Sequence, residues 1–257
     1  IGIMAACWTR RKHLWHFHES ADSLYGWHNS MNGLYRLLAS YRKNTLLYLS
    51  QCQRHEWEQA IGQHPASVIY NPVRLLSKAE TIPHTSIRFG YLGGFEERKN
   101  LPWLLHSFEE LHHEYPSAEL WLSGARNQQE IDSIKAQTSL QEPTLQVRTH
   151  TLSPEEFYSQ IDVFVLPSKK EVMPLVAIEA MMAGIAVIQT AESGLGELMT
   201  EGKDCLFIQP NEETSLLTAM RHITDETTRK EIARNGQQLV LRANFTEHYI
   251  HDLLQLI

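Results

Sequence analysis

Apolar and polar positions alternate in blocks along most of this chain, and the blocks predict strands and helices in turn. The apolar runs have the length of strands and lie at 87–92, 118–123, 145–148, 163–166, 185–189 and 205–208. Between them, apolar residues recur three and four positions apart, as at 101–115, which predicts amphipathic helices. Such alternation with short connections is typical of a doubly wound parallel sheet, so we expect an α/β, Rossmann-like unit at 84–240.

The first 72 residues follow a less regular pattern. Strands are predicted at 14–18, 46–50 and 68–70, with a helix near 51–61. A whole Rossmann-type lobe takes roughly 100–200 residues. We therefore expect 1–72 to be part of a first lobe, N-terminally truncated, and 73–83 to be a linker. The chain opens at Ile1, which agrees with a fragment, although Met4 is an alternative internal start.

The predicted topology indicates which loops carry chemistry. Ligands of doubly wound sheets bind at the carboxyl ends of the strands. The loops at 93–100, 124–128, 149–153 and 167–175 are therefore the candidates. Two helix starts are also clear, because Ser153 and Glu156 have the spacing of a capping box and Pro174 suits a helix opening.

Composition removes several classes of protein. The 257 residues carry 23 basic and 30 acidic side chains, a net charge of −7, which does not suit a general nucleic-acid binder. The basic cluster at 10–13 leaves two alternatives, a solvated turn or a peripheral contact with anionic lipid. Cys7, Cys52 and Cys205 form no CxxC pair, so a reducing, cytoplasmic location is expected, with neither disulfides nor a zinc site.

Two glutamates, Glu171 and Glu179, lie eight positions apart across a predicted strand-to-helix turn. The N–H groups of Leu175 and Val176 at the helix start suit a diphosphate. A carboxylate one turn deeper, at Glu179, can accept both hydroxyls of a ribose. The spacing alone also fits two surface glutamates that flank a helix.

The context of these glutamates resembles glycosyltransferase family 4, the glycosyl transferases group 1 domain of the GT-B fold. The matching segments are the strand end at 165–168, Glu171, the helix segment at 179–181, the Gly-rich turn with its lysine at 92–100, and the glycines before a glutamate at 193–197. The likeness extends over about 66–245. A weaker match covers 15–19, like a histidine-bearing strand end in the family's first lobe.

The resemblance implies a role for each matching residue. Lys99 would pair with the donor diphosphate above the Gly93-Gly94 turn, and Glu179 would hold the ribose. Glu171 would lie by the donor sugar, and His18 would reach the donor sugar or the acceptor from across the cleft. The resemblance also implies that the C-terminal segment, 241–257, forms a helix that packs back toward the first lobe.

The sequence departs from the family's usual pattern at three places. Gly94 stands where the family often has arginine, His150 replaces a glycine, and Met173-Pro174 replaces Phe-Gly. Neighbours at a helix start usually point apart, so Arg98 is not expected to replace the absent arginine beside Lys99.

The function that the resemblance implies is sugar transfer from a nucleotide diphosphate sugar to a glycan, lipid-linked or small-molecule acceptor, in glycan or cell-surface polysaccharide synthesis, with retention at the anomeric carbon. No Asp-x-Asp occurs, so a metal-bridged diphosphate is not expected, and no cofactor beyond the donor is implied. The alternatives are a truncated, non-catalytic nucleotide-binding remnant or subunit and a GT-B-fold nucleotide-sugar epimerase.

Overall fold

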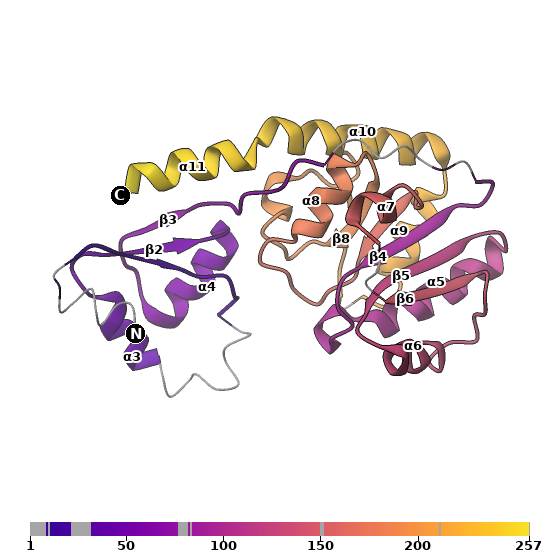
Figure 1. The fold of residues 1–257 in the computed structure, drawn as a ribbon, viewed down its shortest axis with the longest axis horizontal. Coiled ribbons are helices and arrows are strands. Elements are labelled where there is room, and N and C mark those ends of the chain that lie inside the picture. The colour runs from indigo at the N-terminus through magenta and orange to yellow at the C-terminus, as the bar shows by residue number, and fades with distance from the viewer. Residues whose placement is uncertain are drawn as a thin grey trace.

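The computed structural model describes residues 9, 11–21, 32–76, 82, 84–149, 152–210 and 212–256. They form a small and a large lobe, each built on a parallel sheet (Figure 1). The predicted α/β fold is confirmed.

The large lobe contains a six-stranded sheet in the order β6-β5-β4-β7-β8-β9. Its strands are β4 (Arg88–Leu92), β5 (Glu119–Ala125), β6 (Leu145–Thr149), β7 (Val163–Leu166), β8 (Ala186–Thr190) and β9 (Leu206–Ile208). Neighbouring strands all pair in parallel. The strand order reverses between β4 and β7, which is the topological switch point where such sheets bind ligands.

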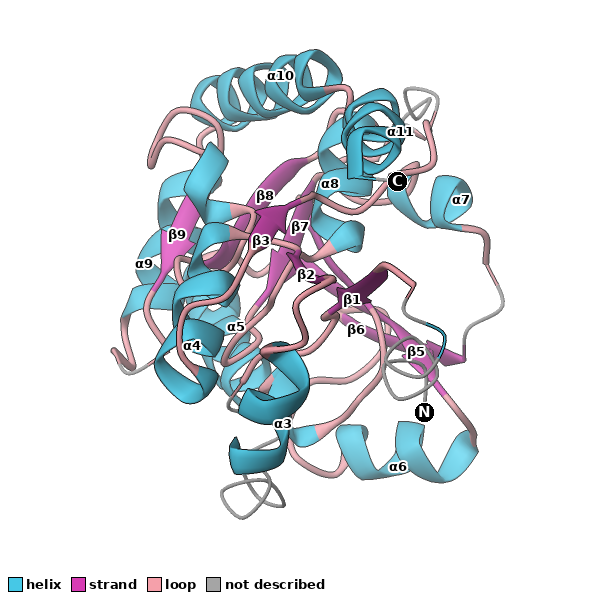
Figure 2. Ribbon diagram, turned by 90° about the vertical axis from the view of Figure 1, so that its left-hand side faces the viewer, coloured by secondary structure: helices cyan, strands magenta, loops and turns pink. Residues whose placement is uncertain are grey.

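Helices lie on both sides of this sheet (Figure 2). They are α5 (Leu101–Glu114), α6 (Gln128–Lys135), α7 (Pro154–Tyr158), α8 (Leu175–Met182), α9 (Ser215–Ile223) and α10 (Glu226–Ala243), with 3₁₀ turns η2 (Glu97–Lys99) and η3 (Gly196–Leu198). Because helices cover both faces, β7 and β8 are buried along their whole length, which explains the unbroken apolar run of β7. The predicted capping box of Ser153 and Glu156 starts α7.

The small lobe has its own sheet and apolar core. Its strands β1 (His13–His16), β2 (Asn44–Tyr48) and β3 (Ala66–Val68) are parallel and lie in that order. Helices α3 (Asn32–Ala39) and α4 (Gln51–Ile61) complete it, and the pattern analysis did not predict α3. In the core, Phe17 stacks on Tyr48 and packs at a tilt against Trp57. The second strand ends earlier than predicted because Ser50 is the N-cap of α4.

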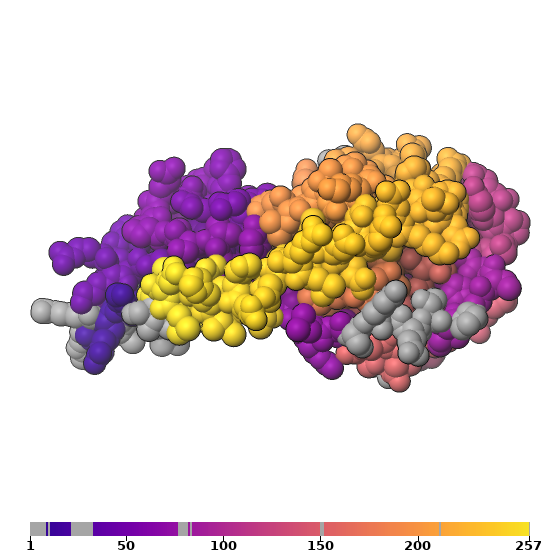
Figure 3. Space-filling model, turned by 90° about the horizontal axis from the view of Figure 1, so that it is seen from above, coloured from indigo at the N-terminus to yellow at the C-terminus, as the bar shows by residue number. Residues whose placement is uncertain are grey.

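The two lobes meet along the segment after β3 and along the C-terminal helix α11 (Phe245–Leu256), which lies over the small lobe (Figure 3). Asn244 adopts a left-handed conformation, φ 39°, and separates α11 from α10. Thr246 Oγ1 donates to the Val73 carbonyl at 2.7 Å and accepts from its N–H at 3.2 Å. Tyr70 and Phe245 pack edge to face. These contacts join the two segments of the chain that cross between the lobes.

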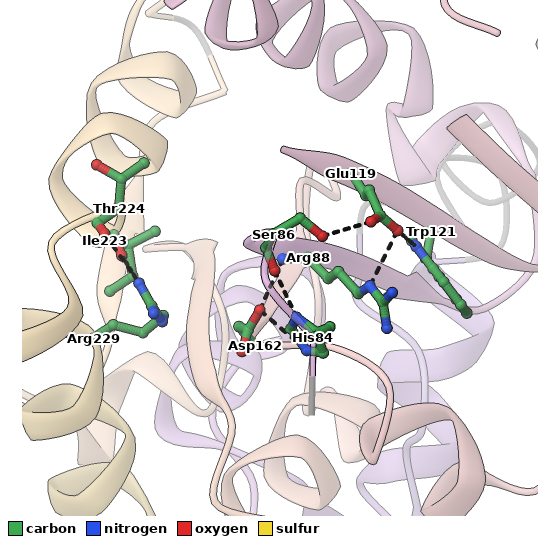
Figure 4. A network of polar contacts seen from close by, with 9 residues as sticks. All are labelled: His84, Ser86, Arg88, Glu119, Trp121, Asp162, Ile223, Thr224 and Arg229. Atoms are coloured by element: carbon green, nitrogen blue, oxygen red, sulfur yellow. Dashed lines mark hydrogen bonds and ion pairs between the residues drawn. The ribbon is translucent and has the colours of Figure 1, made fainter. Parts of the chain in front are cut away.

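A network of polar contacts lies at the amino-terminal end of the large sheet, where its strands begin (Figure 4). Asp162 accepts the N–H of Arg88 at 2.8 Å, and Glu119 accepts from the Arg88 guanidinium at 3.1 Å. His84 Nδ1 donates to the Ser86 carbonyl. The network links the starts of β4, β5 and β7 at the amino-terminal end of the sheet. The cleft lies at the other, carboxyl end.

Candidate functional site

A cavity of about 380 Å³ lies between the two lobes at the carboxyl end of the large sheet. The loops after β4 and β7, the two strands at the switch point, form its large-lobe wall with Arg98 and Glu171. The loop after β1 forms the facing wall with His18 and Glu19. The cavity therefore joins residues that are distant in sequence at the place where doubly wound sheets bind ligands.

On the large-lobe wall, the carboxylate of Glu171 is approached by two cations. Its Oε1 is 2.6 Å from Lys99 Nζ, and each side chain is only 13% exposed. The Arg98 guanidinium lies 3.5 Å from the same oxygen. Two cations thus converge on one carboxylate, and Lys99 is 72 residues from it in sequence. A pair of cations in this arrangement would suit an anion of higher charge.

The expectation that Arg98 points away from Lys99 is wrong. Glu97–Lys99 is a single 3₁₀ turn, and the α-helix begins only at Leu101, after the left-handed Asn100. The spacing rule for side chains on an α-helix therefore does not apply to this pair. Arg98 is 58% exposed and borders the cavity.

Gly93 and Gly94 make the turn that carries the chain from β4 to these cations. Gly93 has φ +153°, and a Cβ at Gly124 would lie 1.9 Å from the Gly93 carbonyl oxygen, so the two backbones touch. Tyr91 Oη donates to the Gly94 carbonyl at 2.6 Å. A Cβ at Gly94 would meet the Glu96 carboxylate at 2.4 Å. Both glycines lie outside the cavity lining and form the turn that precedes Arg98 and Lys99.

Helix α8 starts at the cavity. Pro174 is its N-cap, and Ala177 and Ile178 donate to the Pro174 carbonyl. The N–H groups of Leu175 and Val176 precede the first intrahelical hydrogen bonds, so they carry the positive end of the helix dipole. Leu175 itself lines the cavity.

Glu179 lies one turn deeper along α8, outside the residues that line the cavity. Its Oε2 is 3.5 Å from Tyr158 Oη, which also donates to the Val176 carbonyl at 2.9 Å. Burial raises the pKa of Glu179; the hydrogen bond from Tyr158 opposes that rise and the charge of Glu155 adds to it. The carboxylate is thus held near the helix start with limited solvation.

His18 follows β1 and is exposed to the cavity. Its ring centre is 4.3 Å from that of His16. Burial and the neighbouring His18 lower the pKa of His16 to about 4, so His16 is neutral near pH 7. The structure thus places His18, Glu171 and Leu175 about one cavity, and Lys99 contacts Glu171 beside it. That these residues form one donor site stays a prediction.

The motif comparison missed several residues that border the cavity. Asn71, at the end of the predicted first lobe, lines it and donates its N–H to Met173 Sδ at 3.4 Å. Lys169 and Lys170 add positive charge next to Glu171. In the sequence, their position directly before Glu171 could have indicated that they border the site. His150, singled out as a departure, lies outside the described residues.

Two α/β lobes with a cleft at the switch point of the larger sheet define a protein of the GT-B fold. The family model for glycosyl transferases group 1 matches residues 86–226, and the chain belongs to this family.

Curated relatives and solved structures agree with this placement. The chain is 24% identical over 169 residues to the capsular polysaccharide biosynthesis glycosyltransferase CapM of Staphylococcus aureus, covering 65% of the chain and 44% of that protein. It is 26% identical over 162 residues to the lipopolysaccharide core biosynthesis glycosyltransferase LpsD of Rhizobium meliloti, covering 63% and 46%. Anabaena HepE, solved with UDP and glucose, superposes with a TM-score of 0.83 at 19% identity, covering 98% and 74%.

The chain thus spans less than half the length of these two curated relatives. Among the described residues, none of the helices combines the length and apolar character needed to cross a bilayer.

Proposed function

We propose that the protein takes part in transferring a sugar from a nucleoside diphosphate sugar to an acceptor hydroxyl, and that this chain supplies the donor site. The observation that carries the proposal is the convergence of Lys99 and Arg98 on Glu171 at the switch point, opposite His18. UDP and glucose in the HepE structure are consistent with such a donor.

The large lobe holds the diphosphate in this proposal. Lys99 and the N–H groups of Leu175 and Val176 face the phosphate oxygens, with Arg98 as a second cation. These groups stabilise the negative charge that develops on the leaving diphosphate as its bond to the anomeric carbon breaks. Glu179 accepts hydrogen bonds from the ribose hydroxyls.

The sugar lies between Glu171 and His18. Glu171 accepts hydrogen bonds from sugar hydroxyls and, being negative, stabilises positive charge on the sugar ring in the transition state. His18 contacts the sugar or the acceptor from the small lobe. We propose retention at the anomeric carbon: the acceptor oxygen bonds to the face that the diphosphate leaves, and its proton passes to the departing phosphate oxygen.

The acceptor is proposed to be a glycan, a lipid-linked sugar or a small molecule in cell-surface polysaccharide synthesis, as the names of CapM and LpsD suggest. The reaction is proposed to proceed without a metal ion, because Lys99, Arg98 and the α8 N-terminus supply positive charge to the diphosphate.

Calorimetry of this chain with UDP, GDP, ADP and TDP tests the donor site. We expect one of them to bind, and Lys99→Met to weaken it by about ten- to hundredfold, the value of a charged hydrogen bond of roughly 1.5–3 kcal/mol. Product analysis by NMR with the matching nucleotide sugar then tests retention. Failure of all four to bind would refute the proposal.

A further inference from the structure

Glu197 of the large lobe reaches the first turn of α4 in the small lobe. One carboxylate oxygen accepts the N–H of Gln51 at 3.0 Å, and the other accepts the N–H of Cys52. Ser50 Oγ accepts the next N–H, from Gln53, at 3.0 Å. The start of a helix leaves these donors without intrahelical partners and carries positive charge, so a carboxylate is stabilised there. We name the contact of Glu197 with Gln51 and Cys52 the rim contact.

Two further features bring the lobes together at the same place. Lys170 Nζ lies 2.7 Å from Glu56 Oε1 on α4. A Cβ at Gly194 would lie 2.6 Å from the Ser50 Cβ and 1.9 Å from the Val172 carbonyl oxygen, so the loop that carries Glu197 touches the start of α4 with no room for a side chain. The rim contact is therefore part of a closely packed junction.

Helix α4 in turn holds the loop that carries His18. Gln53 is buried, and its Nε2 donates to the carbonyls of Phe17 at 3.2 Å and Glu19 at 2.9 Å. Trp57 Nε1 donates to the same Glu19 carbonyl at 3.0 Å. The backbone on both sides of His18 is thus fixed to α4.

The loop of Glu197 also holds the backbone at Glu171. Ser193 and Glu171 form a parallel bridge, and the Gly194 N–H donates to the Glu171 carbonyl at 3.3 Å. An unbroken series of contacts therefore runs from the Glu171 loop through Glu197 and α4 to the His18 loop.

We propose that Glu197 is a positioning residue that sets the distance between His18 and Glu171 across the cleft. The linker at Val73 and α11 at Thr246, the two segments that cross between the lobes, are hydrogen-bonded to each other. This crossing and the rim contact together define how far the cleft opens. The catalytic consequence rests on the proposed function, whereas the effect on lobe distance does not.

Spin labels, one on each lobe, test the structural part. Gln59 on α4 and Glu110 on α5 are exposed and carry the labels as cysteines, in a background with Cys7, Cys52 and Cys205 replaced. Double electron–electron resonance then reports the distribution of interlobe distances.

Glu197→Ala should broaden this distribution and shift it to longer distances, and Glu197→Gln, which keeps one acceptor oxygen, should fall between it and the wild type. Glu192→Ala is the matched control, because Glu192 is an exposed glutamate of the same loop. A Glu197→Ala distribution equal to that of the control would overturn the proposal.

Turnover distinguishes positioning from a merely structural role. With the nucleotide sugar found by calorimetry, Glu197→Ala should lower kcat roughly tenfold or more, since a misplacement of about 1 Å can cost that much or more. The Kd for the nucleoside diphosphate should change less than about twofold, and Glu197→Gln should recover part of kcat. An altered distance with unchanged kcat would refute the positioning role. If the wild type binds no nucleotide, the proposed function fails while the distance measurement still stands.

Discussion

Replacing Glu171 by glutamine should strengthen the binding of a bare nucleoside diphosphate while it weakens sugar transfer. In the structure Glu171 neutralises Lys99 at 2.6 Å and approaches Arg98 at 3.5 Å. A phosphate that binds Lys99 must therefore do so beside a carboxylate. The glutamine keeps the shape of the side chain and removes its charge.

The magnitude follows from the geometry. A phosphate oxygen on the far side of the Lys99 ammonium would lie about 5 Å from the Glu171 carboxylate, two hydrogen-bond lengths away. Repulsion between unit charges at that distance is about 0.8 kcal/mol in water and about 3 kcal/mol at an effective dielectric constant of ~20. We expect Glu171→Gln to tighten diphosphate binding at least about fourfold.

Calorimetry with the nucleoside diphosphate and with its sugar conjugate checks this prediction. The conjugate should gain less affinity than the bare diphosphate, because a glutamine accepts hydrogen bonds from the sugar less strongly than a carboxylate. Glu97→Gln is the matched control, since it removes one charge from the same turn at a side chain that is 94% exposed. An unchanged or weakened affinity for the bare diphosphate in Glu171→Gln would refute the assignment of the Lys99–Glu171 pair to the diphosphate site.

Three further predictions concern neighbouring groups. Burial raises the folded-state pKa of Glu179, so ionising this carboxyl group lowers the stability of the fold as pH rises above 4.5. Glu179→Gln should therefore raise the Tm at pH 7 but not at pH 3.5. The same variant should bind the nucleotide more weakly. The pKa of His16 is about 4 in the folded chain and 6.5 in the unfolded chain, so the stability of the fold should decrease as pH drops from 6.5 to 4. Calorimetric scans of His16→Phe should show a smaller decrease. Arg98→Ala should weaken diphosphate binding about fivefold, near 1 kcal/mol for an exposed cation. The same titration checks it, and an unchanged affinity would remove Arg98 from the diphosphate site.

The pattern of apolar residues was sufficient to predict the large lobe. Strands such as β7 are buried on both faces, so their sequence is an unbroken apolar run bounded by polar turns. The small lobe was harder to predict because its elements are short and mixed. Helix α3 has only eight residues, and Leu34 and Leu37 are exposed, so its apolar positions did not mark a buried face.

Candidate residues could be named from the sequence where they lie close together along the chain, and their contacts could not where they lie far apart. Glu171, Glu179 and the start of α8 belong to one strand–helix turn, so their spacing, together with the resemblance to the family, singled them out. The pairing of Lys99 with Glu171 joins loops 72 residues apart, and strand order alone decides it. The contact of Glu197 with α4 joins two lobes, for which a sequence pattern carries no signal.

A crystal structure of this chain with the nucleoside diphosphate that binds it tests the central claim most directly. The account predicts the diphosphate within hydrogen-bonding distance of Lys99 Nζ and of the N–H groups of Leu175 and Val176, with the ribose hydroxyls on Glu179. A nucleotide bound elsewhere, with Lys99 still paired to Glu171, would contradict it.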